Sequence, residues 1–316
     1  MTVDKPGAVD VHAHYLPHRY REVATYHGHA HPDGMPGLPE WSAAAHVELM
    51  DRLGVRMAFL SVSSPGVHVG DDVADTREMA RHVNEVAAET IAAHPGRFGA
   101  FASLPLPDVV AAVAEVGVAI DDLALDGVVL LTNVRGTYLG DASLDPLFDE
   151  LDRRAAVVFI HPTSPPCWEQ ISLGLPRPMI EFPFDSTRAI ANLLLSGTLA
   201  RCPNLQLVVP HAGGAVPVLA GRIVGLGAMA RGLDPSALVG LLRGLWYDLA
   251  GPVVPGALAA VETIADPGRL LFGSDYPFTP AAAVEQAVNG LATMLTADQL
   301  AQLADNAGRL LARARR

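Results

Sequence analysis

Residues 8–15 read AVDVHAHY, an apolar and β-branched run that ends in two histidines. Runs of the same kind recur along the chain, at residues 55–62, 98–105, 125–132, 157–162, 205–212, 245–250 and 270–277. Each consists of about four to eight nearly continuous hydrophobic residues, which is typical of strands buried on both faces of a parallel sheet. The first run therefore predicts a buried parallel strand with polar side chains at its C-terminal end.

Helix-like stretches follow these runs. They cover residues 43–53, 75–93, 108–123, 144–154, 186–201 and 280–295, and residues 297–315 are expected to form a closing helix. Strand and helix alternate eight times, whereas a doubly wound open sheet usually stops at about five to seven strands. The sequence therefore predicts an α/β fold, a (β/α)8 TIM barrel.

No linker composition interrupts residues 1–316, so a single domain is expected. Two longer inserts stand out. Residues 15–40, rich in His, Pro and Gly, follow the first strand, and residues 163–185, rich in Pro, follow the fifth. Both inserts follow strand C-termini, on the barrel face where active sites lie.

Several of the predicted strands end in a histidine or an aspartate. His12 and His14 occupy positions i and i+2 of the first strand, so both can point to the barrel axis. His161, His211 and Asp275 end the fifth, sixth and eighth strands. A set of three histidines and one carboxylate suits one divalent cation, Zn²⁺ or Mn²⁺. The alternative for any single one of them is a hydrogen-bonded core histidine or carboxylate.

Other histidines lie in less favourable places. His94 precedes the third strand, at the opposite end of the barrel, and is expected to be structural. His46 and His82 fall in helix-like stretches and are expected to be solvated. The first insert contains further histidines, which are better explained as an adaptable loop than as a second metal site: His27, His29 and His31.

Composition limits the classes of partner. The chain has 22 Lys and Arg against 34 Asp and Glu, a formal net charge of −12, so neither nucleic acid nor an anionic membrane surface is an expected partner. No apolar stretch approaches the roughly 18–20 residues of a membrane span, and MTVDKPGAVD contains no apolar signal region. The two cysteines match no zinc or redox pattern. A soluble, unprocessed, cytoplasmic protein is expected.

Four motifs in this order resemble the amidohydrolase superfamily: VDVHAH (9–14), FIHP (159–162), PHAGG (210–214) and GSDYPF (273–278). Within it they resemble the metal-dependent, non-oxidative decarboxylases of aminocarboxymuconate semialdehyde and of resorcylates. Three further segments look closest to the 6-methylsalicylate decarboxylase group: residues 97–108, 126–141 and 182–197.

The single lysine, Lys5, bears on metal number. Binuclear hydrolases of this architecture use a carbamylated lysine at the end of strand four, whereas here that strand ends in LLTN (130–133). We therefore expect one metal ion in the site.

The resemblance implies roles for individual residues. It implies that His12, His14, His161 and Asp275 bind the metal and that His211 is the catalytic histidine. It also implies that Arg222 reaches the substrate carboxylate of a neighbouring subunit, in a homodimer or a dimer of dimers. The alternative for Arg222 is an ordinary helix-surface arginine.

The substrate expected from these features is a small aromatic acid. Relatives acting on the muconate semialdehyde use an arginine of the first insert for a second carboxylate, and residues 22–51 here contain none. A salicylate-type monocarboxylate fits better, with the metal chelating its carboxylate and ortho hydroxyl. The resemblance implies that Asp275 protonates the ring carbon. A single-metal hydrolase of a lactone or a C–C bond is the alternative.

Further residues are candidates for supporting roles. Asp248 ends strand seven and is a candidate for orienting a ligand imidazole, with a plain structural carboxylate as the alternative. Asp185 and Arg188 are expected to pair with each other. Four aromatic residues are candidates for substrate contacts, with core packing or, for the tyrosine, loop anchoring as the alternative: Tyr138, Trp168, Phe182 and Phe278.

Overall fold

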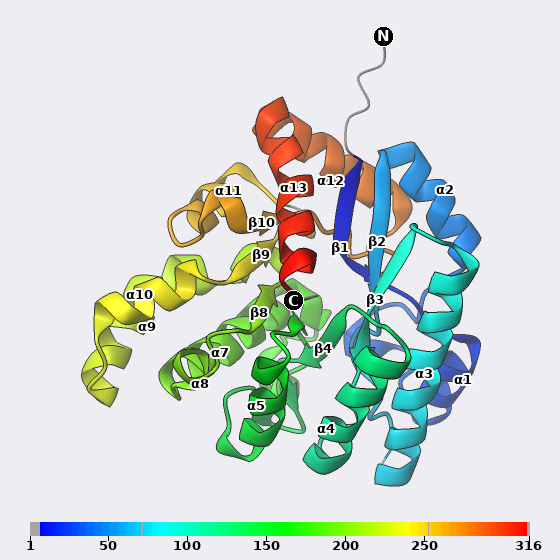
Figure 1. Cartoon of the computed structure of the whole chain (residues 1–316), viewed down its shortest axis with the longest axis horizontal. Helices are drawn as coiled ribbons and strands as arrows, with labels where there is room; N and C mark the ends of the chain where they lie inside the picture. Colours follow the sequence, from blue (N-terminus) through cyan, green and yellow to red (C-terminus); the bar gives the residue numbers. More distant parts are fainter. Residues whose placement is uncertain (1–6, 71, 252, 315–316) are drawn as a thin grey trace.

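Eight parallel strands form the centre of the computed structural model, which describes residues 7–70, 72–251 and 253–314 (Figure 1). The sheet order is β1-β2-β3-β4-β7-β8-β9-β10. The strands are β1 (Ala8–His14), β2 (Val55–Ser61), β3 (Phe98–Ser103), β4 (Gly127–Leu131), β7 (Val157–His161), β8 (Gln206–Val209), β9 (Trp246–Asp248) and β10 (Leu270–Leu271). A short hairpin, β5 (Asn133–Val134) and β6 (Thr137–Tyr138), follows β4.

The last strand meets the first. Parallel bridges join Asp10 to Phe272 and Ala13 to Tyr276, and the amide of Val11 donates to the carbonyl of Phe272 at 3.0 Å. The predicted (β/α)8 barrel is therefore confirmed. The eighth strand is shorter than the predicted 270–277, because regular pairing ends at Leu271 and only single bridges continue.

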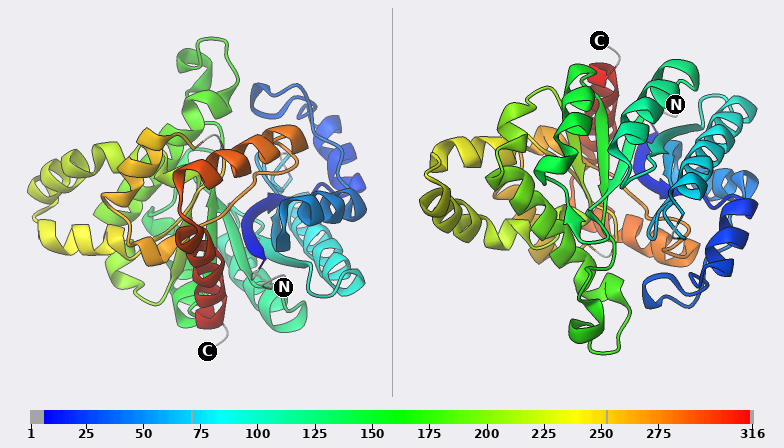
Figure 2. Two further views of the ribbon diagram at one scale, coloured as in Figure 1. Left: turned by 90° about the horizontal axis from the view of Figure 1, so that it is seen from above. Right: turned by 90° about the horizontal axis from the view of Figure 1, so that it is seen from below.

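The helices surround this barrel (Figures 1 and 2). They are α1 (His18–Tyr26), α2 (Ala43–Leu53), α3 (Val73–Ala93), α4 (Val109–Gly117), α5 (Asp145–Arg153), α6 (Trp168–Ile171), α7 (Glu181–Leu195), α8 (Thr198–Arg201), α9 (Val216–Arg231), α10 (Pro235–Arg243), α11 (Pro255–Glu262), α12 (Ala281–Met294) and α13 (Ala297–Ala314). None of the helices in the described ranges is both long and apolar enough to cross a membrane.

Apolar side chains fill the N-terminal part of the barrel interior. Phe59, Phe101 and Phe159 stack in series, with ring centroids 5.4 and 5.5 Å apart. Ala307 and Leu310 of α13 join the same cluster and close the N-terminal end of the barrel. This packed floor leaves the C-terminal end as the place for polar chemistry.

A register shift in β1 lets two adjacent residues face the interior. The pairing with β2 is irregular between Asp10 and Ala13. Val11 belongs to the interior cluster, and the ring of His12 also lies against Phe159, at 4.8 Å. A bulge of this kind re-aims side chains near functional sites. As a result, β1 presents apolar side chains to the interior before the bulge and histidines after it.

Helix α7 starts earlier than the sequence predicts. A helix is expected from residue 186, but α7 begins at Glu181, inside the second insert, and a separate turn, α8, completes the predicted stretch. Phe182 therefore lies on the first turn of a helix instead of in a loop. The first insert likewise contains a helix, α1, whose Tyr20 and Ala24 are buried.

Candidate functional site

Four side chains that could hold a metal ion converge at the C-terminal end of the barrel. Their ligand atoms all lie within 4.8 Å of one another. His12 and His14 end β1, His161 ends β7, and Asp275 follows β10. The histidines are buried, and the Asp275 side chain is 21% exposed. The structure thus brings together all four residues predicted as ligands.

Each of these histidines has its Nδ1 atom next to an oxygen that accepts hydrogen bonds. The partners are Asp248 Oδ2 at 2.9 Å for His12, the Ser61 carbonyl at 3.2 Å for His14, and the Pro162 carbonyl at 2.7 Å for His161. These partners assign the proton to Nδ1 and leave the Nε2 lone pairs free to bind a cation.

The Nε2 atoms face a carboxylate. Asp275 Oδ1 lies 3.0 Å from His14 Nε2 and 3.5 Å from His12 Nε2. His12 Nε2 is buried and makes no hydrogen bond within the described residues. Imidazole lone pairs and carboxylate oxygens that face one another repel each other. A cation bound between them makes the arrangement favourable. The residues present therefore fit one divalent cation, and three imidazoles with one carboxylate suit Zn²⁺ or Mn²⁺.

Asp248 ties two parts of the site together. Its Oδ2 atom accepts from His12, and its Oδ1 atom accepts from the backbone N–H groups of His211 at 2.9 Å and Ala250 at 3.0 Å. His211 lies in a 3₁₀ turn after β8, not on the predicted strand. Its φ of 54° and the φ of 58° at Asp275 are uncommon for residues other than glycine. Such strained backbone persists only where the surroundings hold it.

The electrostatics of the cluster favour one positive charge at its centre. Burial opposes protonation of His12, but Asp248 and Asp275 outweigh burial and raise its pKa to about 10. Burial also opposes ionisation of Asp275, yet the imidazoles of His12 and His14 beside it hold its pKa well below the usual range. Burial lowers the pKa of His211, so its imidazole is neutral near pH 7. His211 Nδ1 is buried and makes no hydrogen bond within the described residues.

A cavity of about 360 Å³ opens beside the cluster. His161, His211 and Asp275 line it together with Phe182 and Phe278. The Phe278 ring lies 5.5 Å from that of His14, and the Phe182 ring lies 6.1 Å from that of His161. We call this cavity the metal pocket. Its remaining walls are largely apolar, with Met35, Met179, Ala212, Ala250, Val253 and Ala257.

The other predicted substrate contacts lie elsewhere. Trp168 lines a second, larger cavity instead of the metal pocket. The Tyr138 hydroxyl donates to the buried carboxylate of Asp185, which agrees with the loop-anchoring alternative. Arg222 is exposed on α9 and lines neither cavity.

One expectation about supporting residues is confirmed and another needs correction. Asp185 pairs with Arg188 at 3.9 Å as expected, and its buried carboxylate also accepts hydrogen bonds from Thr132, Asn133 and Tyr138. His46 is not solvated. It is buried, and its Nδ1 atom accepts a hydrogen bond from the Trp41 indole at 3.1 Å.

Sequence reasoning missed two hydroxyl groups at the cluster. The Ser63 hydroxyl lies 3.3 Å from His161 Nε2, and the Thr279 hydroxyl donates to Asp275 Oδ2 at 3.2 Å. Ser63 directly follows the second predicted strand. A search for polar residues at strand ends, which found the other site residues, could therefore have found Ser63 as well. The sequence carries no comparable signal for Thr279.

Comparisons with known proteins identify relatives of this chain. The amidohydrolase family profile matches residues 9–313. The 6-methylsalicylic acid decarboxylase of Penicillium expansum is 37% identical over 289 residues, which cover 90% of this chain and 89% of that protein. A crystal structure named as an amidohydrolase II is 34% identical, with a TM-score of 0.92, covering 96% of this chain and 99% of the other.

A more distant structure shares the fold. The dihydroxybenzoic acid decarboxylase of Polaromonas sp. JS666, solved with bound manganese and the inhibitor 2-nitroresorcinol, is 20% identical, with a TM-score of 0.82 and 97% of each chain covered. The profile match extends from β1 into α13 and so includes every residue of the cluster. The chain belongs to the amidohydrolase family.

Proposed function

We propose that this chain is a metal-dependent, non-oxidative decarboxylase of a small aromatic acid with a hydroxyl group ortho to the carboxylate. The observation that carries this proposal is the His₃Asp cluster opening on a 360 Å³ cavity between Phe182 and Phe278. Aromatic walls suit an aromatic ring. The 37% identity to a decarboxylase of 6-methylsalicylic acid supports the same chemistry.

The metal ligands in this proposal are His12, His14, His161 and Asp275. A divalent cation held there, Zn²⁺ or Mn²⁺, supplies Lewis-acid stabilisation of negative charge on the substrate carboxylate and ortho oxygen. Asp248 keeps His12 in the required tautomer through the 2.9 Å hydrogen bond to Nδ1.

Asp275 carries the proton in this mechanism. Its pKa lies well below the usual range, so the carboxylate is ionised in the resting site, and in the proposed reaction it accepts the proton of the ortho hydroxyl. It then delivers that proton to the ring carbon bearing the carboxylate. The C–C bond to the carboxylate breaks, its electron pair restores the aromatic ring, and CO₂ leaves. The product phenolate takes a proton from solvent.

His211 orients the substrate. Its ring lines the metal pocket, and its centroid lies 5.0 Å from that of His12, which places the imidazole beside a substrate bound there. The backbone bond to Asp248 fixes the turn that holds it. The apolar walls exclude water from the protonated ring, which favours loss of CO₂ over side reactions.

We also propose that the chain forms a homodimer. Exposed large apolar side chains concentrate on the second insert and the start of α7, and again on α9: Ile171, Leu173, Leu175, Met179, Ile180, Phe184, Val218, Leu226 and Met229. Helix α9 runs alongside α7, with its start beside Pro183 and Thr187 and its later residue Gly227 beside Leu195, so its exposed side chains extend this surface away from the insert. Apolar surface of this kind is typical of an interface. Arg222 lies on α9 within this region, where it can reach a partner subunit.

The test is an assay of a panel of hydroxybenzoates and lactones for CO₂ release and for water consumption. The proposal expects stoichiometric CO₂ from an ortho-hydroxybenzoate, loss of activity with a chelator, and recovery that identifies the ion when Zn²⁺ and Mn²⁺ are restored separately. Ring opening of a lactone without CO₂ would instead identify a hydrolase.

A further inference from the structure

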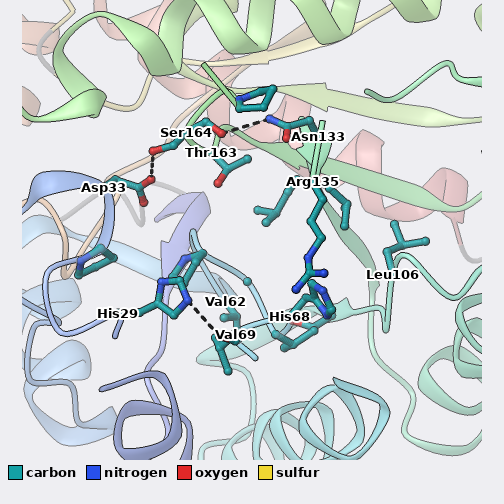
Figure 3. A pocket seen from close by; sticks show the side chains of 18 of the residues that line it. His29, Asp33, Val62, His68, Val69, Leu106, Asn133, Arg135, Thr163 and Ser164 are labelled. Carbon is teal, nitrogen blue, oxygen red and sulfur yellow. Dashed lines mark hydrogen bonds between the residues drawn. The ribbon is translucent and has the colours of Figure 1, made fainter. Parts of the chain in front are cut away.

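A second cavity of about 670 Å³ lies beside the metal pocket and has no role in the proposed reaction (Figure 3). We call it the outer cavity. Pro32 and Asp33 of the first insert line both cavities. The ends of β2, β3 and β4 form an apolar floor that includes Val62, Leu104, Leu106, Val129 and Leu131. Such a floor, at a volume usual for ligand sites, suits the apolar part of a small molecule.

The two inserts meet at the wall of the outer cavity. The Ser164 hydroxyl donates to Asp33 Oδ1, as Figure 3 shows, and Arg177 Nε donates to Ser164 Oγ at 3.0 Å. The Arg177 guanidinium also lies over the Trp168 ring, 4.1 Å from its centroid. These contacts fix an arginine that would otherwise be mobile.

Gly34 leaves room for this arginine. A Cβ atom at position 34 would lie 2.8 Å from Arg177 Nη1, and the φ of 75° there also favours glycine. Stacking, a hydrogen bond and close packing therefore hold the guanidinium in one place before any ligand arrives. Preorganisation of this kind lowers the entropic cost of binding.

This wall presents hydrogen-bond donors that have no acceptor within the described residues. Arg177 uses Nε, while its terminal nitrogens make no hydrogen bond within the described residues, and neither does the Trp168 indole N–H. The one carboxylate among the described lining residues, Asp33, already accepts from Ser164. Guanidinium groups bind carboxylates with two parallel hydrogen bonds. An apolar floor with such a wall matches an aromatic ring that carries a carboxylate.

We propose that the outer cavity is a second, metal-independent binding site for an aromatic carboxylate, with Arg177 as the anchor for its carboxylate. The acid held there is the substrate on its way to the metal pocket, so this inference rests on the proposed function. A chain with a net charge of −12 repels an approaching anion, and a fixed guanidinium beside the pocket offsets that repulsion locally. Ser64 of the metal pocket and Thr163 of the outer cavity are hydrogen-bonded at 2.7 Å, so only a thin polar wall separates the two sites.

The direct test is a crystal of the metal-loaded protein soaked in 4-bromobenzoate, with the bromine located by anomalous scattering. The acid lacks an ortho hydroxyl, so it reports binding without turnover. We expect one bromine in the metal pocket and a second in the outer cavity, with its carboxylate on Arg177. Arg177→Gln should remove the second bromine, whereas Arg243→Gln, a loss of the same charge at an exposed end of α10, should keep both.

Kinetics provide a second measurement. With an accepted hydroxybenzoate, Arg177→Gln should lower kcat/KM about tenfold, the loss expected for one charged hydrogen-bonded contact, while Arg243→Gln stays at the wild-type value. If Arg177→Gln does not fold, Trp168→Leu removes the ring that supports the guanidinium and should weaken the second bromine in the same way.

The outcomes separate the two proposals. A wild-type crystal with no bromine in the outer cavity, or an Arg177→Gln crystal that keeps it, overturns the second site even when the enzyme releases CO₂. A protein that releases no CO₂ from any hydroxybenzoate, yet binds bromobenzoate at Arg177, overturns the decarboxylase proposal and retains an aromatic carboxylate site.

Discussion

Asp248 connects the metal cluster and the His211 turn through hydrogen bonds. It is fully buried, and its two oxygens accept three hydrogen bonds, from the His12 ring and from the amides of His211 and Ala250. Burial opposes its ionisation, but the His12 and His211 imidazoles and the hydrogen bonds from His12 and Ala250 together lower the pKa of Asp248. The carboxylate is therefore ionised and matched to the N–H groups around it.

Asp248→Asn should weaken metal binding. The amide keeps the size of the side chain but no longer offers His12 a charged acceptor, so the Nδ1–H tautomer loses its support. Metal affinity should fall about 10–100-fold, as for other partners of ligand histidines. A competition titration against a chelator measures this change. Asp298→Asn, an exposed change on α13, is the control, and equal affinity in Asp248→Asn and wild type would refute the role.

The burial of His46 leads to a prediction of how the free energy of unfolding depends on pH. Burial lowers its pKa to about 3, and its neutral Nδ1 accepts the Trp41 indole hydrogen bond. The unfolded chain, with an ordinary histidine pKa of about 6.5, binds a proton between pH 3 and 6.5 that the folded chain does not. Stability from this residue is therefore complete above pH 6.5 and is lost as the pH falls towards 3.

His46→Gln should flatten this dependence. From pH 6.5 to 4.5 the wild type should lose roughly 2–3 kcal/mol more of its unfolding free energy than the variant, because one pKa unit corresponds to about 1.4 kcal/mol. Urea unfolding of both proteins at pH 7.5 and 4.5 gives the difference. Parallel pH profiles would mean that His46 is charged in the folded protein.

At the scale of elements, the strands were predictable because their signal is local. Each strand bears an unbroken apolar run, and the polar residues at the run ends of the predicted barrel led to His12, His14, His161 and Asp275. The start of α7 was not predictable in this way, because the Pro-rich insert hides a helix that is stabilised by packing at Phe182.

Burial of polar side chains was harder still to predict. His46 is enclosed by Trp41, by Phe98 of β3 and by Tyr276 beyond β10, residues far apart in the sequence. The carboxylate of Asp185, besides its ion pair with its neighbour Arg188, likewise accepts hydrogen bonds from Thr132 and Asn133 at the end of β4. Periodicity reports one element at a time, whereas these contacts are made between elements.

The junction between β10 and β1 provides a prediction for Gly273. A Cβ atom there would lie 2.7 Å from the Cβ of His12 and 3.0 Å from that of Ala250. Gly273→Ala should push β1 away and disturb the cluster, with a cost of about 1–3 kcal/mol in unfolding free energy and a loss of bound metal. Denaturant unfolding and elemental analysis measure the two effects.

Gly290 provides the matched control. It lies within α12, and a Cβ atom there would meet nothing within 4 Å. Gly290→Ala should leave metal content unchanged and stabilise the protein by about 0.5–1 kcal/mol through its helix propensity. If Gly273→Ala matched this control in both measurements, the close approach of Gly273 to His12 would affect neither stability nor metal binding.

At the scale of the whole molecule, the second insert projects from the barrel and carries much of the exposed apolar surface (Figure 2). Leu173 in this insert is 80% exposed, and Met229 on α9 is 77% exposed. Leu173→Glu combined with Met229→Glu should convert a dimer into a monomer, as measured by light scattering coupled to gel filtration. Val110 on α4 is just as exposed, at 83%, but lies outside this region, so Val110→Glu should remain dimeric. A wild type that is monomeric contradicts the proposed interface.

Arg222 links assembly to activity, and mixed dimers test that link. If Arg222 serves the partner's site, Arg222→Ala and His211→Ala proteins should each be nearly inactive but regain activity when their subunits are unfolded together and refolded. In a mixed dimer, the barrel that retains His211 receives Arg222 from the other subunit, while the second barrel lacks both. Random pairing makes half of the dimers mixed, and half of their sites intact, so about one quarter of wild-type activity should return. An ordinary surface arginine predicts instead that Arg222→Ala is active alone and that mixing adds nothing.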